Sequence, residues 1–453
     1  MIMAAAKAVA GPCAVFWVVP LSGGLLVLAT FGVGRALGSP GAGLLAAVFV
    51  LASPVVLFML MSPMTDIPVA AAWAAAIWLL IGGTPDSARR RAILRATGAG
   101  LAAAIAILIR PNLVGGVLAL GLWFPLRMMR DGPRARRRHA VDAAFFGAAV
   151  AIGVVVVALV NQRLYGSPTT SGYGAASRLF DLANVWPNVK TYFGWFRESQ
   201  TLAPLLGLIV LFVPQAAWPG LRDRAALVVI AAFVVVATGS YLMYGVYDAW
   251  WYLRFLLPVW PFVMLGFAAT VLGAARRSRV LSIAMAVVVV WIVARDVVFA
   301  REHDAFRLWM QERRYATVGR LVRAATEPGS VIFSIQHSGS LRLYAGRMTL
   351  RFDSLEDDWL DRAIAWLSSH GIASYLLVEE WETPRFKGKF RNQDAVSRVD
   401  APPLLEYTGP AIVRLYDLRA SRDSMAPVTR IKEEWQGPKC QAMAPAPQAL
   451  ERE

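Results

Sequence analysis

Few charged side chains lie within or beside the long apolar segments of this chain, and they are the best candidates for chemistry. Asp66 stands in SPMTDIP (residues 62–68), between two such segments. An ionisable group at this depth is costly unless it has a role. Its carboxylate could bind a divalent cation such as Mg or Mn and so orient a phosphate. It could also cap the following helix, whose first turn holds a proline.

Two arginines occupy comparable positions. Arg254 lies in YGVYDAWWYLRFLLP (residues 244–258), after an aromatic cluster that contains Tyr247, and Asp248 precedes it by six residues. Arg110 precedes a proline between two short apolar segments. A guanidinium can hold a phosphate through two parallel hydrogen bonds. Both arginines are therefore candidate phosphate ligands, although each could instead extend to lipid head groups.

The loop 163–201 is rich in glycine and aromatic residues and includes Tyr165 in YGSP. Such a loop suits stacking against a sugar, and an interfacial amphipathic segment would have the same composition. We take Tyr165, Tyr247 and Asp248 as candidate substrate-loop residues. The four histidines are scattered without ligand spacing, so the sequence predicts no zinc site.

The composition indicates a membrane protein. Of 453 residues, 57% are hydrophobic, which is more apolar surface than a soluble core of this size can bury. The net charge of +16 would suit nucleic acid, but the arginines stand between apolar segments, where they mark topology and contact anionic lipid. We therefore expect a lipid bilayer as partner and no nucleic acid.

About ten membrane-embedded helices are expected, and the fold class is mainly α. The apolar segments cover residues 14–33, 41–61, 68–82, 98–109, 112–126, 142–161, 202–219, 225–244, 255–273 and 280–297. The short pair 98–109 and 112–126 could form a re-entrant hairpin or two tilted helices.

The connections between these segments predict the orientation. Five short connections on one side contain 16 Lys and Arg residues, and the opposite side contains seven in a greater length. The arginine-rich side is expected to be cytoplasmic, so Asp66, Arg254 and the C-terminal region lie outside the cytoplasm. The N-terminus then also lies outside, although residues 1–13 hold no exporting segment. We expect at least one further helix upstream, or insertion from residue 14 as a reverse signal anchor.

The pattern after residue 297 changes to short strands alternating with helix. We predict a membrane domain over 1–297, an extracytoplasmic α/β domain over 298–420 and a disordered tail over 421–453. The expected strands are Ser330–Ile335, Met348–Phe352, Ser374–Val378 and Ala411–Leu418, with a helix from Ser354 to Gly371. No nucleotide-binding fingerprint or nucleophile elbow occurs there.

The membrane part resembles the GT-C membrane glycosyltransferases, which include protein O-mannosyltransferases and the lipid A aminoarabinose transferase. The resemblance rests on ASP (residues 52–54) followed by MTDIP (64–68), the Arg-Pro pair at 110–111 and WWYLRFLLP (250–258). It implies inverting transfer of a sugar from a polyprenyl-phosphate donor to a glycan, lipid or protein acceptor on the outer face of the cell membrane. It makes Asp66 a second acidic site residue and Arg254 the phosphate ligand, and it places the catalytic base in an outer loop that precedes this sequence.

Two other functions stay open at this point. A transporter or flippase of lipid-linked substrates would show repeats between the two halves. A non-catalytic membrane scaffold would use its outer domain to bind a partner.

Overall fold

The structure is a computed structural model that describes residues 2–83, 88–172, 179–218, 220–221, 223–419 and 428–432. Two units separate along the chain, Met1–Phe306 and Arg307–Glu453. The boundary lies nine residues beyond the one expected from the sequence because α16, the last membrane helix, continues past its apolar part to Glu302.

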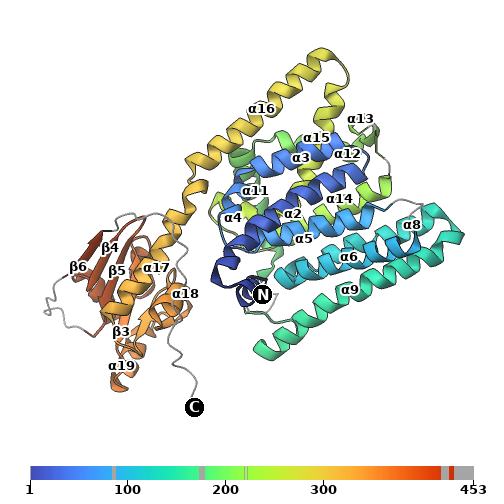
Figure 1. The fold of residues 1–453 in the computed structure, drawn as a ribbon. Helices are drawn as coiled ribbons and strands as arrows, with labels where there is room; N and C mark the ends of the chain where they lie inside the picture. Colours follow the sequence, from blue (N-terminus) through green and yellow to red (C-terminus); the bar gives the residue numbers. More distant parts are fainter. Residues whose placement is uncertain are drawn as a thin grey trace. The chain divides into compact units, whose positions relative to one another are not determined.

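The first unit is helical because an apolar chain in lipid must satisfy its own backbone hydrogen bonds. Its α-helices, drawn in Figure 1, are α1 (Ile2–Ala10), α2 (Val15–Ala36), α3 (Pro40–Ala52), α4 (Pro54–Leu60), α5 (Asp66–Ile81), α6 (Arg89–Ile109), α7 (Gly116–Gly121), α8 (Trp123–Asp131), α9 (Pro133–Tyr165), α11 (Val185–Gln200), α12 (Ile209–Phe212), α13 (Pro214–Ala217), α14 (Arg224–Leu242), α15 (Trp260–Ala275) and α16 (Arg279–Glu302). Short 3₁₀ turns join them, including η2 (Pro111–Leu113), η4 (Ala203–Leu208) and η5 (Trp250–Leu256).

Six helices in the described residues are long and apolar enough to cross a membrane, or up to eight if each bent pair counts as one span. The polytopic, mainly helical fold is as the sequence predicted. Of the two alternatives left open for residues 98–126, the structure favours two helices over a re-entrant hairpin, because α6 and the run Pro111–Asp131 each contain 21 residues and are each long enough to cross alone. The sequence underestimated α6 because its first turns contain the arginines that were read as a loop.

Three of the expected spans are interrupted. Residues 41–61 form α3 and α4, which bend by 64° at Ser53, and residues 250–275 form η5 and α15, which bend by 89°. A proline follows each break closely, and a proline removes a backbone donor and limits the residue before it. Residues 202–219, expected as one span, instead form the short pieces η4, α12 and α13.

Helix α5 is the central element of this unit. Figure 1 shows α2, α5, α6 and α9 side by side, and the contacts between α2 and α5, α5 and α6, and α6 and α9 agree. Almost every residue of α5 is buried, including Trp73, because the helix is apolar all round. The N-terminus of α5 therefore presents Asp66 inside the bundle and not at its surface.

The second unit is an α/β domain with a six-stranded sheet in the order β2-β1-β3-β5-β4-β6. Strand β1 is parallel to β2 and β3, whereas β5 is antiparallel to β3 and β4. The strands are β1 (Val331–Phe333), β2 (Met348–Leu350), β3 (Ser374–Glu379), β4 (Leu405–Thr408), β5 (Ile412–Asp417) and β6 (Thr429–Lys432), and the helices are α17 (Leu308–Ala325), α18 (Ser338–Ser340), α19 (Leu360–Ser369) and α20 (Glu382–Lys389).

Four of these strands match the four predicted ones, and three details differ. Helix α19 begins at Leu360 and not at Ser354, which lies in a 3₁₀ turn. Strand β4 (LEYT) was not predicted, since two of its four residues are polar and its order comes from pairing with β5 and β6. Strand β6 falls in the segment expected to be disordered, where pairing with β4 orders four mostly polar residues. Residues 421–427 and 433–453 of the expected tail lie outside the described ones.

The carboxyl ends of β1 and β3 are joined by a buried polar network. Glu379, at the end of β3, lies 3.0 Å from Nε2 of His337 and accepts hydrogen bonds from Nε of Arg314 and Nε1 of Trp381, at 2.7 and 2.8 Å. Burial acts to raise the pKa of Glu379, but these donors outweigh it and lower the pKa to about 2. The network thus stabilises the domain only while this carboxyl is ionised.

We expect Glu379→Gln to destabilise the second unit by about 2 to 3 kcal/mol, because it leaves Arg314 without its buried charge partner. Hydrogen exchange of the β3 amides in the full chain measures the effect. The exposed neighbouring variant Glu380→Gln is the control. Since the folded-state pKa is depressed, the contribution of Glu379 should be lost as the pH falls from 4.5 towards 2. Equal exchange in both variants would contradict the assignment.

Candidate functional site

A buried ion pair brings together two of the residues selected from the sequence. Asp66 is the first residue of α5 and is 1% exposed. Its Oδ1 accepts a hydrogen bond of 2.5 Å from Nη2 of Arg110, at the junction of α6 and η2. The N-cap residue of α5 is Thr65, so the carboxylate binds a guanidinium 44 positions along the chain and not the start of its own helix.

Arg110 also connects the pair to a third element. Its Nη1 donates a hydrogen bond of 3.1 Å to the hydroxyl of Tyr241, a buried residue near the end of α14. Two donors of this guanidinium are therefore fixed by the protein. These two hydrogen bonds hold the guanidinium of Arg110 in one orientation. A fixed orientation is needed if its positive charge is to face a ligand.

Arg254 lies beside this pair but is not paired in the same way. Its Nε is 4.0 Å from Oδ1 of Asp66, which is beyond hydrogen-bonding distance, and this buried Nε has no hydrogen-bond partner among the described residues. Its Nη1 contacts Sδ of Met64 at 2.9 Å, and a thioether is a weak acceptor. Arg254 therefore retains strong donors for an anion.

The three charges leave an excess of one positive charge, since one carboxylate lies between two guanidinium groups. The side chains of Arg110 and Arg254 are 14% and 17% exposed, so water screens this charge only in part. An excess cation at the edge of an apolar bundle is the arrangement expected for a site that binds a phosphate group.

Aromatic rings fix the two guanidinium groups relative to each other. Phe255 contacts both of them, with both Cζ atoms 5.5 Å from its ring centroid. Arg254 also lies 4.9 Å from the ring of Tyr252, which stacks on Tyr247 with centroids 4.2 Å apart. Cation–π contacts of this kind stabilise a cation without supplying a hydrogen-bond acceptor. They keep Arg254 in place while its donors stay open.

Four of the six candidate residues thus come together: Asp66, Arg110, Arg254 and Tyr247. Asp248 is an exposed residue of the loop before η5, and no contact within the described ranges connects it to this cluster. Tyr165 is the last residue of α9 and is 45% exposed. The structure does not bring Asp248 and Tyr165 into the ion-paired cluster.

Two important members of the cluster were not identified from the sequence. Tyr241 and Phe255 stand in apolar segments where aromatic residues are common, and neither was singled out, although Phe255 lies in the motif WWYLRFLLP. Tyr241 gave one usable signal, because a buried tyrosine hydroxyl within a span needs a partner. Phe255 gave none, since its role depends on two arginines 144 positions apart.

The residues at this site do not fit a divalent cation. No group of three or more His, Cys, Asp or Glu side chains within the described ranges could hold a metal ion. Asp66 faces two guanidinium groups, which repel a cation and occupy the carboxylate.

Comparison with known proteins shows the fold. No family model matches the sequence, and no curated protein matches it significantly. The crystal structure of ArnT from Cupriavidus metallidurans bound to undecaprenyl phosphate matches with a TM-score of 0.56 and 14% identity, over 93% of this chain and 87% of that one. The apo form of ArnT matches with a TM-score of 0.54 and 13% identity, over 91% and 86%.

A third solved structure is more distant. The archaeal oligosaccharyltransferase AglB from Archaeoglobus fulgidus, in complex with an inhibitory peptide and a dolichol-phosphate, matches with a TM-score of 0.51 and 9% identity. The match covers 83% of this chain and 59% of AglB. ArnT and AglB both belong to the GT-C superfamily. The chain therefore has the GT-C fold, as the motifs around Asp66, Arg110 and Arg254 predicted.

Proposed function

We propose that this protein is a membrane glycosyltransferase that moves a sugar from a polyprenyl-phosphate donor to an acceptor hydroxyl. The observation that carries the proposal is the unpartnered buried Nε of Arg254 beside the Asp66–Arg110 pair. Two solved structures of the same fold contain a polyprenyl phosphate, undecaprenyl phosphate in ArnT and dolichol-phosphate in AglB, and this supports a lipid phosphate as the anion.

In the proposed reaction the acceptor oxygen attacks the anomeric carbon from the side opposite the phosphate. A new carbon–oxygen bond forms while the bond from that carbon to the phosphate oxygen breaks, and the electron pair goes to the phosphate. The configuration at the anomeric carbon is therefore inverted. Arg254, with Arg110 beside it, stabilises the negative charge that develops on the leaving phosphate. The excess positive charge of the cluster therefore suits the departure of the phosphate.

Asp66 acts in this proposal as a positioning residue. A carboxylate that accepts a 2.5 Å hydrogen bond from Arg110 is poorly placed to take a proton from the acceptor as well. The acceptor proton then goes to a general base other than Asp66. Asp66 keeps Arg110 in the orientation in which Tyr241 and the substrate phosphate can share its donors.

The acceptor, whether glycan, lipid or protein, reaches the site from the side of the loop before η5. Tyr247 is a part-exposed member of the cluster of tyrosines next to Arg254 and stacks on Tyr244 and Tyr252, so we propose that it contacts a sugar through its ring edge and hydroxyl. Asp248 and Tyr165 remain candidates for contacts with the acceptor. The reaction is proposed for the outer face of the cell membrane, where the positive-inside pattern places Asp66.

Arg254→Gln should weaken binding of undecaprenyl phosphate about tenfold and lower the rate of transfer about a hundredfold, because one charged hydrogen-bond donor to the phosphate is lost. Arg254→Lys should recover part of the binding. Binding to the purified full chain in detergent measures the first effect. A panel of labelled polyprenyl-phosphate sugars, supplied in membranes, measures the second.

The matched control is Arg301→Gln, which changes an exposed arginine in the last turn of α16. It should bind and transfer as the unchanged protein does. If Arg254→Gln also transfers at the unchanged rate, at equal expression, the proposed site is wrong and the transporter and scaffold functions become the better candidates.

Asp66→Asn should destabilise the first unit by about 3 kcal/mol, since it leaves the Arg110 guanidinium buried without its charge partner. The double variant Asp66→Asn/Arg110→Gln should recover most of this loss but not the transfer activity. Thermal unfolding in detergent of the unchanged protein, both single variants and the double variant measures the coupling energy between the two residues. An Asp66→Asn protein with full stability and no transfer would instead indicate that Asp66 itself takes the acceptor proton.

A further inference from the structure

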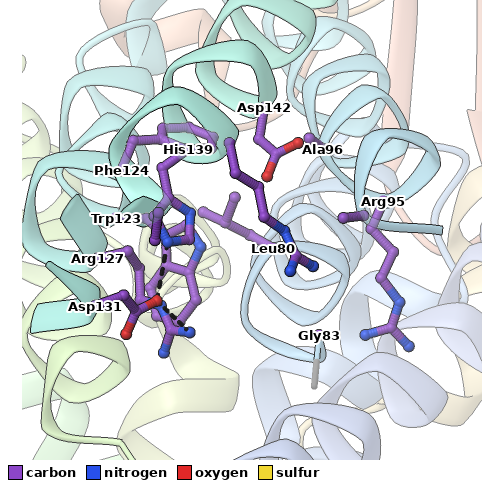
Figure 2. A pocket seen from close by; sticks show the side chains of 13 residues that line it. Leu80, Gly83, Arg95, Ala96, Trp123, Phe124, Arg127, Asp131, His139 and Asp142 are labelled. Carbon is purple, nitrogen blue, oxygen red and sulfur yellow. Dashed lines mark hydrogen bonds and ion pairs between the residues drawn. The ribbon is translucent and has the colours of Figure 1, made fainter. Parts of the chain in front are cut away.

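A second polar cluster lies at the other end of α5 from Asp66, about 24 Å away for a helix of 16 residues. It lines a cavity of about 270 Å³ formed within the first unit by the end of α5 and by α6, α8 and α9. Figure 2 shows Arg95 and Gly83 on one side of this cavity and Arg127, Asp131 and His139 on the other. The proposed transfer reaction uses none of these residues.

The acidic groups at this cavity are neutralised by neighbours. Asp131 accepts from Nη2 of Arg127 and lies 2.9 Å from Nε2 of His139. Asp142 accepts a hydrogen bond of 2.8 Å from Arg89. Nη1 of Arg127 also donates to Asp223 at 2.7 Å. The carboxylates of the described residues at the cavity are thus engaged and do not compensate a further cation.

Arg95 is that further cation. Its Nη1 is buried and has no hydrogen-bond partner among the described residues. The guanidinium lies against Gly82, where a Cβ atom, if the residue had one, would stand 3.3 Å from Nη1. The same Cβ would stand 2.7 Å from the carbonyl oxygen of Trp78, so the guanidinium packs closely on the backbone at the end of α5. A buried donor without an acceptor is costly, and a bound anion would remove that cost.

The surroundings of the cavity favour a lipid as the source of the anion. Leu94 precedes Arg95 on α6, and Met129 stands between Arg127 and Asp131 on α8; they do not line the cavity and are 59% and 71% exposed. Apolar side chains this exposed at the end of membrane spans face acyl chains. Trp123, under the guanidinium of Arg127 at 5.3 Å, is a residue typical of the membrane interface. A phosphate at this depth would have its acyl chains beside these residues.

We propose that the cavity binds the phosphate of an anionic membrane lipid, with Arg95 as its main ligand. The lipid occupies the arginine-rich end of the bundle, opposite the site of sugar transfer, and joins α5, α6, α8 and α9 at that end. A free phosphate has the same charged group, so the experiment must separate the two sources. The proposal does not depend on the proposed function.

The test uses the purified full chain, with phosphatidylglycerol and phosphatidylcholine as the probes and native mass spectrometry as the readout. The unchanged protein should retain phosphatidylglycerol in preference to phosphatidylcholine. Arg95→Gln should weaken the retention of phosphatidylglycerol about tenfold. Arg95→Lys, which keeps the charge, should have an intermediate effect and provides a second variant if Arg95→Gln does not fold.

The matched control is Arg91→Gln, an exposed arginine one turn earlier on α6 that does not line the cavity. It should retain phosphatidylglycerol as the unchanged protein does. Equal weakening by Arg91→Gln and Arg95→Gln would show attraction by surface charge alone and would overturn the site. Displacement of the lipid by inorganic phosphate at comparable concentration would overturn the lipid as ligand. Retention unchanged in both Arg95 variants would overturn the proposal altogether.

Discussion

The architecture of the first unit depends on one buried ion pair, between Asp66 and Arg110. An isolated charge at either position would cost several kcal/mol, so neither residue is tolerated without the other. The pair joins the start of α5 to the end of α6, and Tyr241 extends it to α14. Three elements that are remote in the sequence are thereby held at one point. Apolar packing alone, which has no direction, would not fix that point.

Pairing of Asp66 with Arg110 also determines what the neighbouring arginine can do. Because the carboxylate is already engaged, Arg254 receives charge stabilisation at 4.0 Å but no hydrogen bond. The rings of Tyr252 and Phe255 hold its guanidinium without accepting its hydrogens. Together these contacts produce a cation that is fixed in position and still able to bind an anion. A flexible surface arginine would lose more conformational entropy on binding.

The sequence was informative where charge is rare. Asp66, Arg110 and Arg254 could be selected because a charged residue beside an apolar segment is unusual, and the structure places all three in one cluster. Tyr241 and Phe255 escaped notice, since aromatic residues are ordinary in such segments and their roles arise only from tertiary contacts. Asp248 stands close to Arg254 in sequence, but Arg254 lies within η5 and Asp248 lies in the loop before it, where it is exposed.

In the fold, too, features with a strong local sequence signal were predicted, and features that depend on tertiary contacts were not. Continuous apolar length predicted α2, α14 and α16 well, since a span of that kind has no other stable state in lipid. The length of the apolar segment 202–219 could not predict that it forms the short pieces η4, α12 and α13. Mean hydropathy is insensitive to the positions of turn-forming residues within a segment. In the second unit the apolar strands were predicted, and β4 and β6 were not, since their pairing orders residues that carry little local signal.

Comparison of the buried arginines separates structural from ligand-binding roles. Arg347 in the second unit is 8% exposed, and its guanidinium donates to Thr326 and to the carbonyls of Ala345 and Arg323. Such an arginine is fully used by the fold. Arg254 and Arg95 differ, because each has a buried guanidinium nitrogen without a partner among the described residues. They lie near opposite ends of α5. This buried helix therefore connects the two sites at which an arginine has a hydrogen-bond donor without a protein acceptor among the described residues.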